Sequence, residues 1–134
     1  MSKKYLKKII AQSSSDLQII SACCFEASVE LENIKYLKKN KIFLMSIERY
    51  NLESQNNKNK INSIIKFEYI ESSKSKNIDQ SRPKITIKLI AIEVFKKQHN
   101  YEIILLFSNN AFITLTTEII EVTLEDQKIN DKNN

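Results

Sequence analysis

Residues 85–95 read ITIKLIAIEVF, the most strand-like stretch of this 134-residue chain. In an extended strand, alternate residues from Ile85 to Glu93 fall on one face, and Ile90, Ile92 and Val94 fall on the other. Because apolar residues occupy both faces toward the end of the stretch, we expect this strand to be covered on both sides there.

Further strand patterns lie on both sides of this segment, separated by polar turns. We expect strands or strand pairs at residues 6–10, 29–32, 34–50, 64–71, 101–108, 111–117 and 118–125. The polar residues 51–62 and 72–84 are expected to be connections. The chain has no glycine, so Asn109 and Asn110, which tolerate left-handed backbone angles, are expected to form the tight turn of the last hairpin. Short turns imply antiparallel neighbours.

One amphipathic helix is expected over residues 16–26. Ser13, Ser14 and Ser15 offer caps, and Ser15 and Gln18 have the spacing of a capping box. Leu17, Ile20 and Cys24 recur on one face at helical spacing. The sequence therefore predicts an α+β fold, with this helix packed on a curved, mainly antiparallel sheet or half-open barrel of about seven strands. A single domain is expected over residues 1–126, followed by a frayed tail over residues 127–134.

The composition argues against most small-molecule sites. Without glycine the chain lacks a phosphate-binding loop, a dinucleotide fingerprint and a nucleophile elbow. His99 is the only histidine, and Cys23 and Cys24 are the only cysteines, so neither a histidine-based triad nor a zinc site is expected. The sequence favours a non-catalytic protein without metal or cofactor.

The cysteines also indicate the compartment. Adjacent cysteines rarely pair with each other, so the pattern favours a reducing interior, and we expect a cytoplasmic protein. The apolar runs are too short for a membrane span, and no membrane association is expected.

The candidate binding residues lie around the two arginines. Lysine, asparagine and isoleucine dominate this chain, and only Arg49 and Arg82 of the 21 cationic residues are arginine, whose planar fork supports bidentate hydrogen bonding. Pro83, the only proline, restricts Arg82, and Asp79 and Ser81 are able to build a turn before it. Arg82 then either pairs with Asp79 in a rigid loop or reaches an anionic group on a partner.

Arg49 lies within an apolar alternation near the end of the first hairpin. Its alternatives are contact with an aromatic face, an ion pair with Glu53, or a binding role beside the loop residues.

The net charge of +5 combines −3 over residues 118–134 with +8 over the rest. A basic surface of this kind is compatible with nucleic acid. Most aromatic residues, however, fall on core-facing positions instead of offering stacking platforms. The sequence thus predicts a binding or interaction module with a protein partner, and a basic nucleic-acid-binding domain is the alternative.

The order of several short motifs carries a family resemblance. They are Asp16-Leu17, Ile20-Ser21-Ala22, Tyr36-Leu37, Arg49-Tyr50 with Glu53, Ile78-Asp79-x-Ser81-Arg82-Pro83 and Leu89-Ile90-Ala91-Ile92. Over roughly residues 5–126 the chain resembles a family of short uncharacterised alphaproteobacterial proteins, classed as a domain of unknown function. The chain departs from that family at Asn109-Asn110, where glycine is frequent, and at Leu52, where tryptophan is frequent. The resemblance implies no activity, cofactor or catalytic residue.

Overall fold

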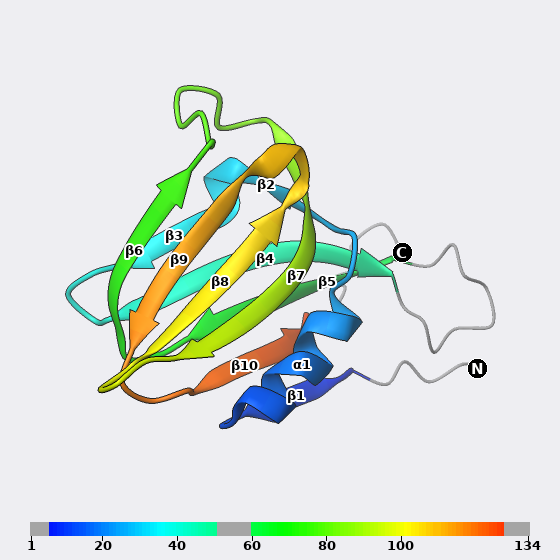
Figure 1. The fold of residues 1–134 in the computed structure, drawn as a ribbon. Helices are drawn as coiled ribbons and strands as arrows, with labels where there is room; N and C mark the ends of the chain where they lie inside the picture. Colours follow the sequence, from blue (N-terminus) through cyan, green and yellow to red (C-terminus); the bar gives the residue numbers. More distant parts are fainter. Residues whose placement is uncertain (1–5, 51–59, 128–134) are drawn as a thin grey trace.

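The computed structural model describes residues 6–50 and 60–127. These residues form one helix and an antiparallel sheet of ten strands (Figure 1). In chain order the elements are β1 (Lys8–Ala11), α1 (Ser14–Cys23), β2 (Ala27–Glu30), β3 (Ile34–Leu37), β4 (Ile42–Tyr50), β5 (Lys60–Phe67), β6 (Ile70–Lys76), β7 (Thr86–Lys96), β8 (Tyr101–Phe107), β9 (Phe112–Thr117) and β10 (Val122–Asp126). The short 3-10 turns η1 (Leu31–Asn33) and η2 (Ser108–Asn110) follow β2 and β8.

The sheet curls on itself without closing. Its order is β1-β10-β5-β4-β2-β7-β8-β9-β6, and β3 pairs with β4 beside this path. The expected helix and open antiparallel sheet are therefore confirmed. The expected number of about seven strands is wrong, because short or polar segments such as β2 and β6 also join the sheet.

Helix α1 lies against β1 and β7 at one end of the sheet (Figure 1). Of the three candidate serines, Ser13 caps it, and not Ser15 with Gln18: the Ser13 hydroxyl accepts a hydrogen bond from the Asp16 amide at 3.1 Å. The Ser21 hydroxyl accepts from the Ile92 amide at 2.9 Å. The helix thus provides a hydrogen-bond acceptor for the edge of β7 beyond the point where its partner strand β2 ends. It has neither the length nor the apolar content to cross a bilayer, and no other helix occurs among the described residues.

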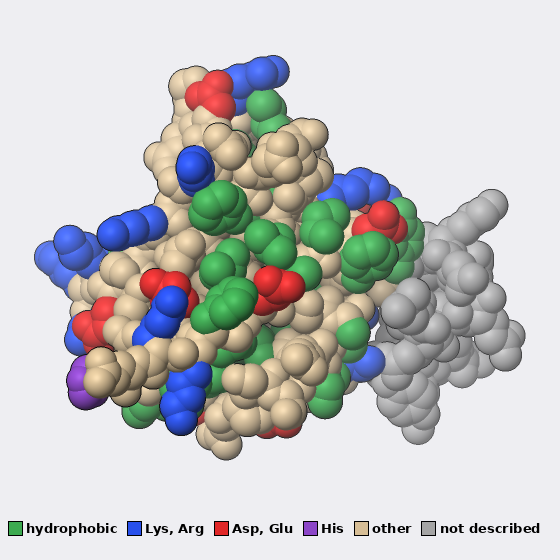
Figure 2. All heavy atoms as spheres, viewed as in Figure 1, with side chains coloured by type: hydrophobic (Ala, Val, Ile, Leu, Met, Phe, Trp, Pro, Cys, Tyr) green, Lys and Arg blue, Asp and Glu red, His purple; other side chains and the backbone are tan. Residues whose placement is uncertain are grey.

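A β-bulge at Ile90 explains the apolar pattern of β7. Leu89 pairs with Phe107 and Ala91 with Leu106, so Ile90 is one extra residue on this strand. The buried positions change accordingly from Leu89 to Ile92. Ile90 is 37% exposed, and hydrophobic side chains are visible on the outer face of this sheet region (Figure 2). The expected cover on both sides is therefore wrong.

Four predicted segment boundaries are wrong. The strand expected at 64–71 is two strands, because the chain turns at Tyr69, where φ is 62°. Residues 72–76, expected in a connection, belong to β6, which pairs on one side only within residues 6–50 and 60–127. Of the connection expected at 51–62, residues 60–62 belong to β5. Residues 51–59 lie outside the described residues. Residues 118–121 likewise precede the last strand, which starts at Val122.

One apolar core lies inside the curled sheet. Phe43 of β4 and Phe67 of β5 meet edge to face with ring centroids 5.8 Å apart. Leu17, Ile20 and Cys24 bring the helix into the same cluster, as their spacing predicts.

Left-handed backbone angles occur at residues other than glycine. Within the described ranges they are found at Glu26, Lys41, Tyr69, Asn77, Asn109 and Asn110. The predicted turn at Asn109 and Asn110 is confirmed, with φ of 63° and 61°. Glutamate is less suited than asparagine to left-handed backbone angles, but Glu26 has φ of 63°. Its amide donates to the Leu89 carbonyl at 2.7 Å, which holds the backbone in place there. The fold thus holds Glu26 in a costly conformation.

Replacing Glu26 by glycine should raise the melting temperature by about 3 °C. A left-handed angle costs an ordinary residue about 1–2 kcal/mol, and the extra freedom of glycine in the unfolded chain offsets only part of this gain. Glu30→Gly is the control, since Glu30 has φ of −84°. Calorimetry should show a lower melting temperature for this control, and a lower value for Glu26→Gly as well would contradict the argument.

Candidate functional site

A groove separates β3 from β6, where the sheet stays open. In the described part of the chain, β3 pairs only with β4 and β6 only with β9, so two strand edges face each other at the left of Figure 1. The space between them has a volume of about 410 Å³. We call it the β3–β6 groove.

Apolar side chains form most of the groove. Phe43 of β4 and Ile113 of β9 form its buried floor. Ile34 and Tyr36 line it from β3, whereas β6 contributes Ser73 and Ser75. Leu31, Ile78 and Pro83 complete its apolar lining. The groove therefore offers apolar contacts below and polar serines along one wall.

Hydrogen bonds join the two sides of the groove at each of its ends. At one end the Tyr36 hydroxyl donates to the Ile70 carbonyl at 2.8 Å, and the Ile70 amide donates to the Lys41 carbonyl at 2.8 Å. At the other end the Glu32 amide donates to the Pro83 carbonyl at 3.0 Å. Between these ends no backbone hydrogen bond joins β3 to β6 within the described residues.

Residues 77–83, the 77–83 loop, follow β6 and cover the groove. The Asp79 carboxylate accepts from the Ser81 hydroxyl at 2.6 Å and from the Ser81 amide at 3.0 Å. The hydroxyl bond is the main cause of the lowered pKa of Asp79. The Arg82 amide then donates to the Asp79 carbonyl at 3.1 Å. Asp79 and Ser81 thus build the turn that places Pro83 on the groove.

Arg82 is exposed beside this turn. In the ranges that the structure describes, its guanidinium forms no hydrogen bond or ion pair, so the predicted pair with Asp79 is not formed. Its charge nevertheless contributes to the lowered pKa of Asp79. The loop therefore presents a cation that its own carboxylate does not bind.

Arg49 lies elsewhere, in a buried polar cluster that we call the Arg49 network. Its Nη2 lies 2.8 Å from both carboxylate oxygens of Asp126, and its Nε donates to the Ser63 hydroxyl at 3.1 Å. The Ser63 hydroxyl donates to Asp126 at 2.6 Å, and the Lys7 amide donates to it at 2.8 Å. Arg49 is only 2% exposed, so it does not join the four loop residues at one surface. Glu53, its other predicted partner, lies outside the described residues.

The sequence contains a signal for this network that the prediction missed. Arg49 follows Phe43, Met45 and Ile47 on the buried face of β4. Asp126 likewise follows Val122 and Leu124 on the buried face of β10. Opposite charges on two buried faces indicate a buried ion pair, because an unpaired buried charge is costly.

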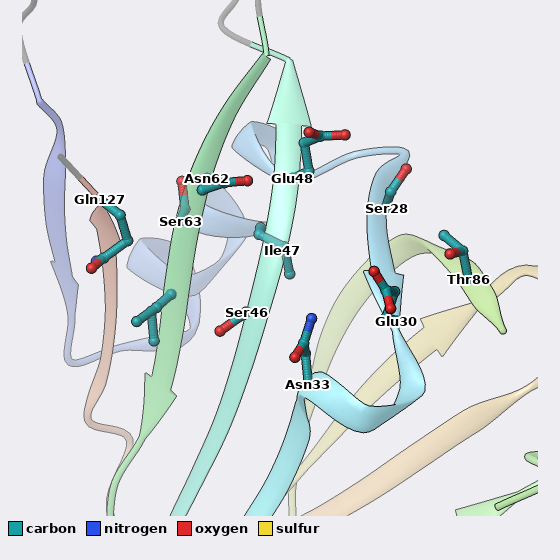
Figure 3. Close-up of a pocket in the computed structure, with 11 residues that line it drawn as sticks. Ser28, Glu30, Asn33, Ser46, Ile47, Glu48, Asn62, Ser63, Thr86 and Gln127 are labelled. Atoms are coloured by element: carbon teal, nitrogen blue, oxygen red, sulfur yellow. The ribbon is translucent and has the colours of Figure 1, made fainter. Parts of the chain in front are cut away.

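A second, polar hollow of about 560 Å³ lies against β2, β4 and β5 (Figure 3). Its side chains are mainly hydroxyls and amides, with the carboxylates Glu30 and Glu48. Glu48 forms an exposed ion pair of 3.7 Å with Lys60. No group of three potential metal ligands occurs among the described residues.

One of the two cysteines is also unsuited to nucleophilic chemistry. Both are free, and Cys24 is fully buried in the core. Burial raises the pKa of Cys24 to about 12, so its thiol stays protonated at neutral pH.

Fold and groove together define an open antiparallel sheet protein with an exposed pair of strand edges. Over residues 7–133 the chain matches the family described as "Protein of unknown function (DUF2948)", and it belongs to that family. Comparison with curated proteins and comparison with solved structures found no match.

Replacing Asp126 by asparagine should lower the free energy of unfolding by about 3–5 kcal/mol, because Arg49 then stays buried without its counter-charge. Urea unfolding at pH 7 measures this loss. Glu125→Gln is the matched control, since Glu125 is an exposed carboxylate on the same strand. A loss below about 1 kcal/mol for Asp126→Asn would contradict a structural role.

The same pair should govern acid stability. Burial alone raises the pKa of Asp126, but the hydrogen bonds from Ser63, Lys7 and Arg49 and the charge of Arg49 together hold it below the ordinary value of 3.8. The stabilisation is therefore complete above the unfolded pKa and is lost as the pH falls through the lower, folded pKa. Urea titrations from pH 6 to pH 2 should show this loss in the natural protein and a shallower loss in Asp126→Asn.

Proposed function

We propose that this protein is a non-catalytic binding module that holds an extended segment of a partner protein in the β3–β6 groove. The observation that carries the proposal is the pair of unpaired strand edges facing each other over an apolar floor. Such edges recognise a peptide by adding it to the sheet as a strand.

The backbone of β6 supplies the first part of the binding energy. Away from β9, Ile70 donates to the Lys41 carbonyl and accepts from the Tyr36 hydroxyl. The described residues provide no backbone partner for residues 71–76 on that side. An added strand lies about 4.8 Å from its neighbour and pairs with these amides and carbonyls.

Side-chain contacts supply the second part. Phe43 and Ile113 lie at the bottom of the groove, with Ile34 and Tyr36 on one wall. Alternate residues of a bound strand point toward such a floor, so each apolar side chain placed there leaves water. Backbone pairing thus gives affinity, and the shape of the floor selects the side chains.

The 77–83 loop provides the remaining contacts. Asp79 and Ser81 hold its turn, Pro83 lines the groove, and Arg82 offers a free guanidinium beside it. These residues form the most specific part of the family resemblance, Asp79-x-Ser81-Arg82-Pro83. Arg49 supports the groove indirectly, because it stabilises β4, the strand that carries Phe43.

The cell compartment belongs to the same proposal. We place the protein in the cytoplasm, and the family resemblance implies an alphaproteobacterium. Two free thiols, Cys23 and Cys24, support a reducing environment.

Filling the groove should abolish peptide binding. Ser73 lines the groove on β6, and Ser73→Trp places a large side chain in it without removing a core residue. Peptides selected from a random phage-displayed library on the full-length protein should bind Ser73→Trp at least tenfold more weakly by fluorescence anisotropy. Ser46→Trp, an exposed change in the polar hollow, is the control and should leave affinity unchanged.

Hydrogen exchange and the melting temperature complete the test. Bound peptide should protect the amides of residues 71–76 from hydrogen exchange, and both tryptophan variants should keep the melting temperature within a few degrees. Failure to select any peptide, or equal affinity in Ser73→Trp, would contradict the proposal.

A further inference from the structure

Given the proposed function, we infer that the segment bound in the β3–β6 groove alternates apolar residues with acidic ones. The inference rests on the two faces of the groove strands. One face is the apolar groove already described, and the other carries free cations.

The two faces follow from the alternation of side chains along a strand. On β3, Ile34 and Tyr36 line the groove, and Lys35 between them is exposed. On β6, Ser73 and Ser75 line it, whereas Lys74 and Lys76 are exposed. A strand lying between β3 and β6 has the same period of two, so one half of its side chains faces the floor and the other half lies beside these lysines.

The carboxylates around the groove are already occupied. Glu32 pairs with Lys84 at 2.9 Å, and Glu71 pairs with Lys41 at 3.2 Å. The Lys84 hydrogen bond is the main cause of the lowered pKa of Glu32. Asp79 accepts the two bonds from Ser81. In the described ranges these three carboxylates thus bind Lys84, Lys41 and Ser81 directly, whereas Lys35 and Arg82 act on Glu32 and Asp79 only through their charge.

The other cations beside the groove are Lys35, Lys74, Lys76 and Arg82. In the described part of the chain none of them forms an ion pair. Figure 2 shows basic side chains at the left edge of the molecule, over the β3–β4 turn and β6, and at the top, over the loop that follows β6. Opposite charges on neighbouring strands stabilise pairing, and like charges oppose it. The site is thus complementary to acidic side chains and excludes basic ones.

The groove favours an acidic peptide over a nucleic acid. A single-stranded nucleic acid needs exposed aromatic faces on which its bases stack. The groove aromatics form its floor and one wall, Phe43 below and the half-buried Tyr36 on β3, so neither ring projects from the sheet for a base to stack on. The edge amides and carbonyls, by contrast, match a peptide backbone.

Three eight-residue peptides test the inference on the full-length protein. They alternate valine with glutamate, glutamine or lysine, and each carries the same fluorophore. At low salt the glutamate peptide should bind about tenfold more tightly than the glutamine peptide, through several cross-strand charge pairs. The lysine peptide should bind more weakly than both, and the preference for glutamate should decrease as salt is added.

Charge reversal provides the decisive variant. Lys74→Glu with Lys76→Glu should reverse the order of the glutamate and lysine peptides, and exposure of both side chains predicts an unchanged melting temperature. Lys88→Glu with Lys96→Glu, two exposed positions on β7, is the control that should keep the original order.

The outcomes separate this inference from the function on which it rests. Equal affinity for the glutamate and glutamine peptides, or no effect of reversal at Lys74 and Lys76, overturns the inference and leaves strand addition supported. Absence of binding by all three peptides overturns both. Tighter binding of an oligothymidylate that Lys74→Glu with Lys76→Glu abolishes would establish the nucleic-acid alternative instead.

Discussion

The buried ion pair between Arg49 and Asp126 is the interaction on which the rest of the sheet depends. It joins β4 to the end of β10, and Ser63 and the Lys7 amide extend it to β5 and the start of the chain. A slip of one residue in β4 or β10 would move Arg49 or Asp126 to the opposite face of the sheet. A buried charge pair discriminates against such a slip more strongly than apolar contacts do, because a slip leaves a charge without its partner. We therefore assign the register of this half of the sheet to the Arg49 network.

The predictability of the fold varied with the position of each strand. Inner strands such as β8 and β9 are apolar enough to be found from their alternation, and the Asn109-Asn110 turn follows from asparagine chemistry. Edge strand β6 has no such signal, because its residues 72–76 are serines and lysines that meet water on one side. The bulge at Ile90 is equally hard to predict from the sequence. An extra residue shifts the apolar alternation by one position, and this gives the same sequence pattern as a strand that is apolar on both faces.

The candidate site was predictable only where it is local. Asp79, Ser81, Arg82 and Pro83 lie in one loop, and turn chemistry identified them together. The groove beneath them combines residues of β3, β4, β6 and β9, which only the strand order brings side by side. Arg49 was grouped with the loop because it is a rare residue type, and rarity says nothing about position. Its partner lies 77 residues away, beyond the reach of local patterns.

The open edge of β6 also has a consequence for solubility. An unpaired strand edge is a template for self-association, and proteins commonly place lysines there to prevent it. Lys74 and Lys76 lie on this edge, where a second copy of the same strand would bring like charges together. The two lysines proposed to bind an acidic peptide therefore also repel a second copy of β6. The edge stays accessible to a peptide, and edge-to-edge aggregation is opposed.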